Sequence, residues 1–173
     1  MRHVFILNPA AGKHRSAVSL IPEIEAVFRR VKDAYAIHVT DAPGAATALA
    51  RQEADKGDPV RLYACGGDGT LLEVFRGMAH APNAQLACVP CGSGNDFVRM
   101  LPRPRRFRSI AAQVAGTPRR LDSLRCNGEP AMNLCSMGMT ITLSLLLSST
   151  ISSTVPSKPL NGPSVILTAS PVT

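Results

Sequence analysis

Apolar residues in this chain fall into short runs that alternate with segments of helical spacing. The runs predict four buried strands, over residues 2–7, 34–40, 60–65 and 85–90. The spacing between them predicts helices over 16–31 and 45–56, a third helix beginning at residue 70 and a fourth over 97–101. Strands and helices that alternate in this way are typical of an α/β fold with an open parallel sheet. At 173 residues, the default expectation is one domain.

Two helix boundaries depend on single residues. Pro22 fits the first turn of a helix that starts near Ser19, but it would kink a helix that starts at Ser16, so the first helix keeps two alternative starts. Gly57 is predicted to occupy the C′ position after the second helix.

Three of the predicted strands end in loops that contain glycine and lead into a helix. In chain order these loops hold Asn8, Pro9 and Gly12; Gly66, Gly67, Asp68, Gly69 and Thr70; and Gly92, Ser93, Gly94, Asn95 and Asp96. Because the carboxyl ends of parallel strands share one edge of the sheet, we expect the three loops to meet there. Glycines let a ligand approach the backbone, and helix N-termini attract anions, phosphate above all. The pattern therefore predicts a phosphate-binding edge.

Asp68 needs a partner in such a site, because a carboxylate repels a phosphate. Mg²⁺, bound directly or through water, would remove the conflict; in the simpler alternative Asp68 only caps a helix and the glycines only turn the chain. Thr70 and Glu73 are spaced as a capping box, so the third helix is expected to begin at Thr70. Asn95 or Asp96 either caps the fourth helix or hydrogen-bonds within its own loop.

Several other chemistries lack their sequence signals. The GxGxxG fingerprint of dinucleotide-binding folds is incomplete, because Leu72 and Phe97 occupy the third glycine position, and no GxxxxGK[ST], HExxH or GxSxG occurs. Cys88 and Cys91 form a CxxC, but Cys88 lies inside a predicted strand instead of at a helix start, so both are interpreted as small packed residues. The odd number of five cysteines favours reduced thiols.

The net charge of +7 indicates an anionic partner. Aromatic residues make up only 4% and Trp is absent, which argues against nucleic acid as that partner. Residues 97–121 hold seven Arg and no acid, which indicates either a solvated basic face or attraction to an anionic membrane. The arginines expected to face the membrane are Arg99, Arg103, Arg105, Arg106 and Arg108. With no apolar run near ~20 residues, we expect a cytoplasmic protein, peripheral at the inner face of the membrane.

The three loops, read in order as NPAAG, GGDGT and GSGNDF, resemble those of the diacylglycerol kinase catalytic domain over about residues 1–139. The resemblance implies a three-layer α/β domain that presents ATP and Mg²⁺ to a lipid hydroxyl. It implies that Asp68 belongs to the magnesium and phosphate network, with Asp96 supporting it. The residues that it places around the nucleotide are Asn8, Pro9, Gly12, Gly66, Gly67, Gly69, Thr70, Gly92, Ser93, Gly94 and Asn95. The alternatives are an NAD kinase-like enzyme, which shares GGDGT, and a non-catalytic nucleotide-binding remnant.

The chain departs from this family at single positions and after residue 139. Ser93 stands where Thr is usual, and Leu72 stands where Asn is common. The family has a C-terminal β-sandwich that carries an acid resembling the general base. Here residues 140–173 instead hold eight Ser, six Thr and a single charge, on Lys158. We therefore expect a domain over 1–139, an atypical tail over 140–173 that is disordered or frame-shifted, and a missing sandwich. The general base stays unknown, since no motif makes Asp122 or Glu129 one.

These departures lead us to expect weak or absent phosphate transfer by this chain. The sequence leaves open which lipid is the acceptor and whether the chain forms a homodimer.

Overall fold

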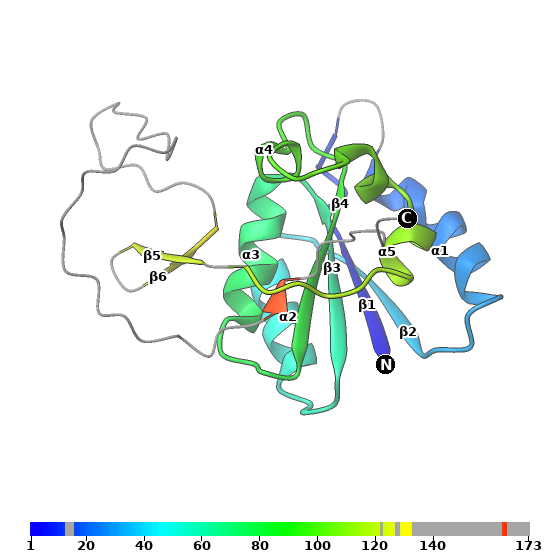
Figure 1. Cartoon of the computed structure of the whole chain (residues 1–173), viewed down its shortest axis with the longest axis horizontal. Helices are drawn as coiled ribbons and strands as arrows, with labels where there is room; N and C mark the ends of the chain where they lie inside the picture. The colour runs from blue at the N-terminus through cyan, green and yellow to red at the C-terminus, as the bar shows by residue number, and fades with distance from the viewer. Residues whose placement is uncertain (13–15, 122, 127–128, 133–163, 166–173) are drawn as a thin grey trace.

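The protein is built around a parallel β-sheet (Figure 1), which the computed structural model describes together with its flanking helices over residues 1–12, 16–121, 123–126, 129–132 and 164–165. The strand order is β2-β1-β3-β4-β7, and every neighbouring pair is parallel. The strands are β1 (Arg2–Leu7), β2 (Tyr35–Val39), β3 (Val60–Gly66), β4 (Ala84–Pro90) and β7 (Ser164–Val165). The predicted parallel α/β fold is confirmed.

Helices cover both faces of the sheet and give the three-layer arrangement that the sequence predicted (Figure 1). One face carries α2 (Ala45–Ala54) and α3 (Asp68–Met78); the other carries the short 3₁₀ helix η1 (Ala17–Leu20), α1 (Ile21–Phe28) and α5 (Ile110–Val114). Two further short elements, α4 (Asp96–Arg99) and the 3₁₀ helix η2 (Pro104–Arg108), follow β4.

The alternation of side chains along each strand divides the core into two layers. On β1, Val4 and Ile6 pack with α2 and α3, whereas Phe5 and Leu7 pack with η1 and α1. All four are fully buried, as expected for a parallel strand covered on both faces. The sheet is thus a rigid platform whose carboxyl edge carries the loops between strands and helices.

Close packing between α2 and α3 depends on Gly77. A β-carbon at this position would lie 2.4 Å from the Thr47 carbonyl oxygen and 2.7 Å from the Ala50 β-carbon. Thr47 also donates a hydrogen bond of 3.0 Å to the backbone carbonyl of Glu73. These contacts fix the position of α3 relative to α2, and hence one wall of the site described below.

The first helix differs from its predicted range of 16–31. Ser16 caps η1 by accepting a hydrogen bond from the Val18 amide, and α1 begins only at Ile21, with Pro22 in its first turn. The physical reason is that Pro22 cannot donate inside a helix, so the chain starts a new helix around it. A start near Ser19 was the closer alternative, and the helix ends at Phe28 instead of residue 31.

The second helix ends close to its predicted position. Its C-cap is Asp55, so Lys56 is the C′ residue and Gly57, which was predicted to be C′, lies one residue further along the chain. Gly57 still has the positive φ of 83° that a helix-terminating glycine adopts, and its amide donates to the Ala54 carbonyl at 3.2 Å.

Two short strands beyond the main sheet were not predicted. β5 (Leu124–Cys126) and β6 (Glu129–Ala131) form an antiparallel pair, and the Arg76 side chain of α3 donates to the Pro130 carbonyl at 3.4 Å. The expectations for Asp122, for the last residues of the expected 1–139 domain (133–139) and for nearly all of the tail concern parts outside the described residues. The exception in the tail is β7, which pairs with Gln85 and Leu86 of β4.

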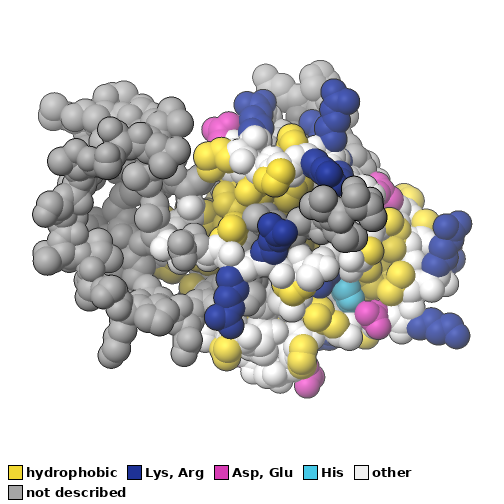
Figure 2. Space-filling view, in the orientation of Figure 1, with side chains coloured by type: hydrophobic (Ala, Val, Ile, Leu, Met, Phe, Trp, Pro, Cys, Tyr) yellow, Lys and Arg dark blue, Asp and Glu magenta, His cyan; other side chains and the backbone are white. Residues whose placement is uncertain are grey.

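Lys and Arg side chains are spread over the face of the molecule shown in Figure 2, and several gather near the end that carries α4. This distribution accords with the net charge of +7. Within the described part of the chain, no helix is both long enough and apolar enough to cross a membrane.

Candidate functional site

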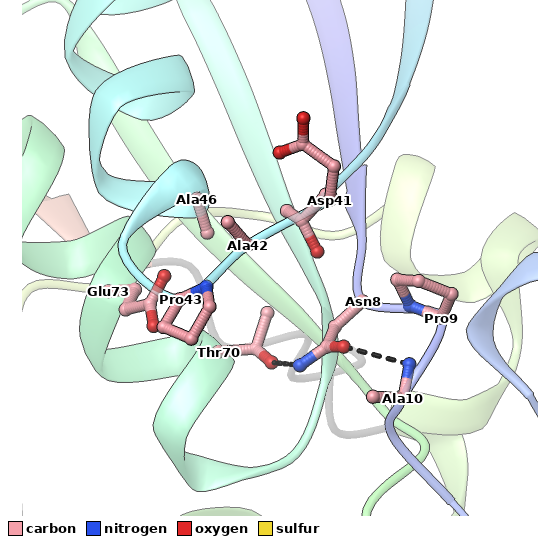
Figure 3. A pocket seen from close by; sticks show the side chains of 10 residues that line it. Asn8, Pro9, Ala10, Asp41, Ala42, Pro43, Ala46, Thr70 and Glu73 are labelled. Atoms are coloured by element: carbon pink, nitrogen blue, oxygen red, sulfur yellow. Dashed lines mark hydrogen bonds between the residues drawn. The ribbon is translucent and has the colours of Figure 1, made fainter.

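Asn8 links the loop after β1 to the start of α3 (Figure 3). Its side-chain amide donates to the Thr70 hydroxyl at 3.0 Å, while its side-chain oxygen accepts from the Ala10 amide at 3.0 Å. The second bond closes a tight turn around Pro9. Proline is tolerated there because the amide that closes the turn belongs to Ala10, so no backbone N–H is needed at Pro9. Gly12 then takes a positive φ of 88°, a conformation that favours glycine. The first loop is therefore shaped by the residues that the sequence singled out.

The start of α3 corrects the predicted capping box. The helix begins at Asp68 with Gly67 as its N-cap, two residues before the predicted start, and the N-cap makes no side-chain hydrogen bond. Thr70 is buried, accepts from Asn8, and packs against Gly66, where a β-carbon would lie 2.3 Å from the Thr70 hydroxyl oxygen. Thr70 therefore joins two loops instead of capping its own helix, and Glu73 is left to face the cavity described below.

The second and third loops touch through glycine backbone. The amides of Cys91 and Gly92 donate to the Gly66 carbonyl at 2.8 and 3.2 Å. A β-carbon on Gly92 would lie 2.6 Å from the Gly67 α-carbon, which is closer than any real side chain permits. Glycine is thus required at position 92 for the two loops to meet.

Asp68 is fixed by the third loop. Its two carboxylate oxygens accept from the backbone amides of Asp96 at 3.0 Å and Phe97 at 3.1 Å. A β-carbon on Gly94 would lie 3.3 Å from an Asp68 oxygen and 3.8 Å from an Asp96 oxygen, so both carboxylates flank Gly94. The capping role of the simpler interpretation is therefore present, although Asp68 caps α4 and not its own helix. Each oxygen keeps a lone pair for a cation or water.

Asn95 stabilises the third loop and does not cap α4. It adopts left-handed backbone angles, with φ of 55° and ψ of 45°, and its side-chain amide donates to the Gly92 carbonyl. Of the two predicted alternatives for Asn95, hydrogen bonding within the loop is confirmed. The carboxylate of Asp96 instead pairs with Arg99 at 3.5 Å, and both side chains are exposed.

A cavity of about 260 Å³ opens between the first loop, the residues after β2 and the start of α3 (Figure 3). Its apolar lining comes from alanines and prolines, and its polar lining from Asn8, Thr40, Asp41, Thr70 and Glu73. The contribution of residues 40–43 was not predicted, because this loop, although it ends in Gly44 at the N-cap of α2, carries none of the motifs that marked the other three loops. The available signal was topological, since the loop after β2 leaves the sheet at the same edge.

Three cysteines whose side chains the structure describes contribute to packing. Cys65, Cys88 and Cys91 are buried, as expected for cysteines that act as small packed residues. Burial, with a smaller effect of the nearby Asp68 charge, raises the pKa of the Cys88 thiol to about 12. Because the thiolate is the nucleophile and metal ligand, Cys88 is inert at neutral pH. Among the described residues, no group of three or more His, Cys, Asp or Glu side chains is arranged to hold a metal ion.

The structure thus brings together the predicted site residues of all three loops. Their contacts with nucleotide and metal stay predictions. The arrangement has one chemical capability: a carboxylate pair beside open glycine backbone can hold a cation, and the cation can in turn hold phosphate.

Comparison with known proteins identifies the relatives of this arrangement. The family model described as diacylglycerol kinase catalytic domain matches residues 2–126. The diacylglycerol kinase of Staphylococcus saprophyticus is 33% identical over 141 residues, covering 80% of this chain and 46% of that relative. The diacylglycerol kinase of Bacillus subtilis is 30% identical over 136 residues, covering 77% of this chain and 44% of that relative.

The fold has the same relatives. A crystal structure of a diacylglycerol kinase from Bacillus anthracis superposes with a TM-score of 0.61 and 27% sequence identity, covering 77% of this chain and 45% of that one. This chain therefore spans less than half the length of these relatives.

Proposed function

Because this chain belongs to the diacylglycerol kinase catalytic domain family, we propose that it binds Mg-ATP at the carboxyl edge of its sheet, for transfer of the γ-phosphate to a lipid hydroxyl. Diacylglycerol or a related lipid is the proposed acceptor. The observation that carries the proposal is the clamp on Asp68, whose two oxygens are aimed beside Gly94 by the amides of Asp96 and Phe97. Phosphoryl transfer requires mainly such fixed positioning and neutralisation of charge.

The phosphates are proposed to lie over the second and third loops. Gly69 is exposed at the start of α3, and a β-carbon there would meet no atom within 4 Å. No packing inside the protein therefore explains this glycine, whereas the approach of a phosphate to the backbone would. The positive end of the eleven-residue α3 helix adds to the attraction.

The base of the nucleotide is proposed to occupy the cavity of Figure 3. Alanine and proline side chains give it an apolar wall on which a flat ring can rest. Asp41 and Glu73 supply carboxylates, which accept hydrogen bonds and suit the exocyclic amino group of adenine. The same carboxylates would repel the carbonyl oxygen that guanine carries at that position.

Magnesium is proposed to bind at the Asp68 and Asp96 carboxylates, which both lie beside Gly94. Mg²⁺ is usually held by one or two carboxylates, with phosphates and water completing its coordination. Asp68 would be the direct or water-bridged ligand, and Asp96 would support it. The bound ion would neutralise charge on the transferred phosphate, while Asp68 keeps its position through the two amides.

The lipid side of the reaction is proposed for the whole protein, because this chain covers less than half of its relatives. Among the described residues, the carboxylates beside Gly94 are already assigned to metal and phosphate, so we assign the general base to neither. We therefore propose that nucleotide binding belongs to this chain and that its transfer activity alone is weak.

A thermal melt with and without Mg-ATP tests the proposal, because a ligand of the native state stabilises it by about 2.7 kcal/mol at a hundredfold excess over Kd. Asp68→Asn keeps an oxygen acceptor for α4 but loses the charge, and it should reduce the magnesium-dependent part of the shift. Gly69→Ala should stabilise the free protein by about 0.5–1 kcal/mol, since it removes a glycine from a helix, yet weaken Mg-ATP binding.

The Gly69→Ala result separates function from folding. A variant that is more stable and binds Mg-ATP as well as the unaltered chain would contradict the phosphate placement. No shift with Mg-ATP in the unaltered chain would contradict nucleotide binding itself. Transfer to diacylglycerol in mixed vesicles, followed by isotope from labelled ATP, then measures whether this chain completes the reaction.

A further inference from the structure

A second cavity, of about 350 Å³, lies between the β4–α4 loop and η2. Its walls include the backbone of Gly92–Asn95 and the side chains of Arg99, Arg105 and Arg108, and no Asp or Glu lines it. It lies next to the loop that positions Asp68 but shares no lining residue with the cavity of Figure 3. It is therefore a separate, strongly positive hollow at the same edge of the sheet.

The geometry of η2 brings two of these arginines together. A 3₁₀ helix has three residues per turn, so Arg105 and Arg108 lie one above the other on one side of η2. Phe107 is buried, with 1% of its surface exposed, and anchors η2 to the core. Both arginines are thus held at the cavity by the packing of the element that carries them.

The three arginines of the cavity, Arg99, Arg105 and Arg108, have little compensating negative charge within the described residues. Arg99 pairs with Asp96 at 3.5 Å, but both side chains are more than two-thirds exposed, so this pair is weak. No ion pair joins Arg105 or Arg108 to a described carboxylate. Guanidinium groups gathered around one hollow repel one another, and an anion between them removes that cost. Their planar fork matches two oxygens of a phosphate group.

We propose that this cavity binds a phosphate group, and that its source is the headgroup of an anionic phospholipid. The β4–α4 loop, with Gly92 and Gly94, would then lie between the transfer site and the membrane surface. The acceptor lipid would in that case lie beside Asp68. The inference rests on the proposed function for its purpose but not for its test, because vesicle binding needs no nucleotide. General attraction to a charged surface would involve all exposed arginines alike, whereas this site depends on Arg105 and Arg108.

The test is co-sedimentation of the full chain with phosphatidylcholine vesicles, with and without phosphatidylglycerol, in the absence of ATP. Arg105→Gln with Arg108→Gln should weaken binding to the anionic vesicles roughly 30-fold, from the contribution of two basic residues near the surface. Arg119→Gln with Arg120→Gln is the matched control, because it removes the same charge from exposed positions outside the cavity and should change binding only a few-fold.

A second pair of substitutions separates the cavity from net charge. Arg105→Lys with Arg108→Lys keeps the charge but loses the planar fork, and it should weaken vesicle binding several-fold. Thermal melts of each variant establish that it is folded. A second arm adds inorganic phosphate and measures the melting shift of the same set.

Three results would overturn the proposal. The two glutamine pairs could weaken vesicle binding equally, which would indicate diffuse attraction. The lysine pair could bind as tightly as the unaltered chain, which would exclude a fork-shaped site. Inorganic phosphate could give a shift that depends on Arg105 and Arg108 while vesicle binding is unaffected, which would assign the cavity to a soluble phosphate and not to a lipid.

Discussion

Single atoms decide how the loops at the carboxyl edge meet. Gly92 can approach the Gly67 α-carbon because Gly92 has no β-carbon, and Thr70 can reach Asn8 because Gly66 leaves room for its side chain. The three loops are consequently one packed unit, and a change at one position is transmitted to the others through backbone.

Gly92→Ala should be strongly destabilising. The added β-carbon would lie 2.6 Å from the Gly67 α-carbon and 3.1 Å from the Asn95 side-chain oxygen, and the first of these is backbone that cannot rotate away. Overpacking of this kind typically costs about 1–3 kcal/mol. Urea unfolding measures the loss. Gly69→Ala adds the same methyl group where no atom lies within 4 Å, so it serves as the control; equal effects of the two substitutions would contradict the packing argument.

Among the elements, α5 shows how a helix of five residues is held in place. Its first amide, on Ile110, donates to Glu23 of α1 at 3.1 Å. At its other end, Arg61 of β3 donates to the Gln113 and Val114 carbonyls at 3.1 and 2.8 Å. Isolated helices this short are unstable in water, so α5 exists because other elements satisfy its ends.

Gln113 connects α5 to β4 and η2, and its loss should loosen all three. Its side-chain amide donates to the Cys88 carbonyl at 2.6 Å and the Phe107 carbonyl at 3.2 Å, and the residue is fully buried. Gln113→Leu keeps the size but leaves both carbonyls without this donor, so we expect a loss of about 2 kcal/mol or more in unfolding free energy. Gln52→Leu, the same change at an exposed position of α2, should stay within about 0.5 kcal/mol.

Hydrogen exchange of the η2 amides gives a second readout for this variant. Faster exchange is expected in Gln113→Leu and unchanged exchange in Gln52→Leu. If Gln113→Leu melts and exchanges like the unaltered chain, Gln113 does not connect these elements.

The elements that the sequence predicted are those with strong local signals. The strands over 2–7 and 85–90 were found within one residue, because continuous apolar runs mark buried parallel strands. The helices α5 and η2 were not predicted, since α5 is held by Glu23 and Arg61 from distant parts of the chain, and η2 is in turn held by Gln113 of α5. A local sequence pattern carries no information about such long-range contacts.

In the candidate site, too, features with a local sequence signal were predicted and features that depend on distant residues were not. Its three loops could be predicted because glycine and asparagine carry local conformational signals. The start of α3 was predicted wrongly, because Thr70 and Glu73 match a capping box in spacing while the competing partner of Thr70, Asn8, is 62 residues away. The contribution of Asp41 to the cavity was missed because it depends on topology and not on a motif.

At the scale of the whole molecule, the opposite end of the sheet carries a buried polar and aromatic cluster far from the glycine loops along β1. His3 is 3% exposed; its ring nitrogens contact the Tyr63 hydroxyl at 2.7 Å and an Asp33 carboxylate oxygen at 3.2 Å. Tyr63 in turn stacks on Phe5 with ring centroids 4.2 Å apart. This cluster stabilises the platform without touching the proposed site, so its protonation should affect folding and leave the site chemistry intact.

Stability should therefore fall as the pH drops below about 6.5. Burial lowers the pKa of His3 from its ordinary value of 6.5, although the hydrogen bond with Asp33 opposes the shift. Between the folded and unfolded pKa values the unfolded chain binds more protons, so unfolding free energy decreases as pH falls, with a limiting slope of about 1.4 kcal/mol per pH unit for one proton. Below the folded pKa this loss is complete.

Urea unfolding from pH 8 down to about pH 5 measures this slope for the unaltered chain and two variants. That range stays above the ordinary Glu value of 4.5, which matters because hydrogen bonds from Lys56 and Arg2 outweigh burial and hold the pKa of Glu53 below it. His3→Gln removes the titrating group and should flatten the slope, whereas His80→Gln, at an exposed position, should leave it unchanged. If His3→Gln kept the full slope, another group would have to carry it, and the packed cluster around Tyr63 would have no part in the acid sensitivity of the fold.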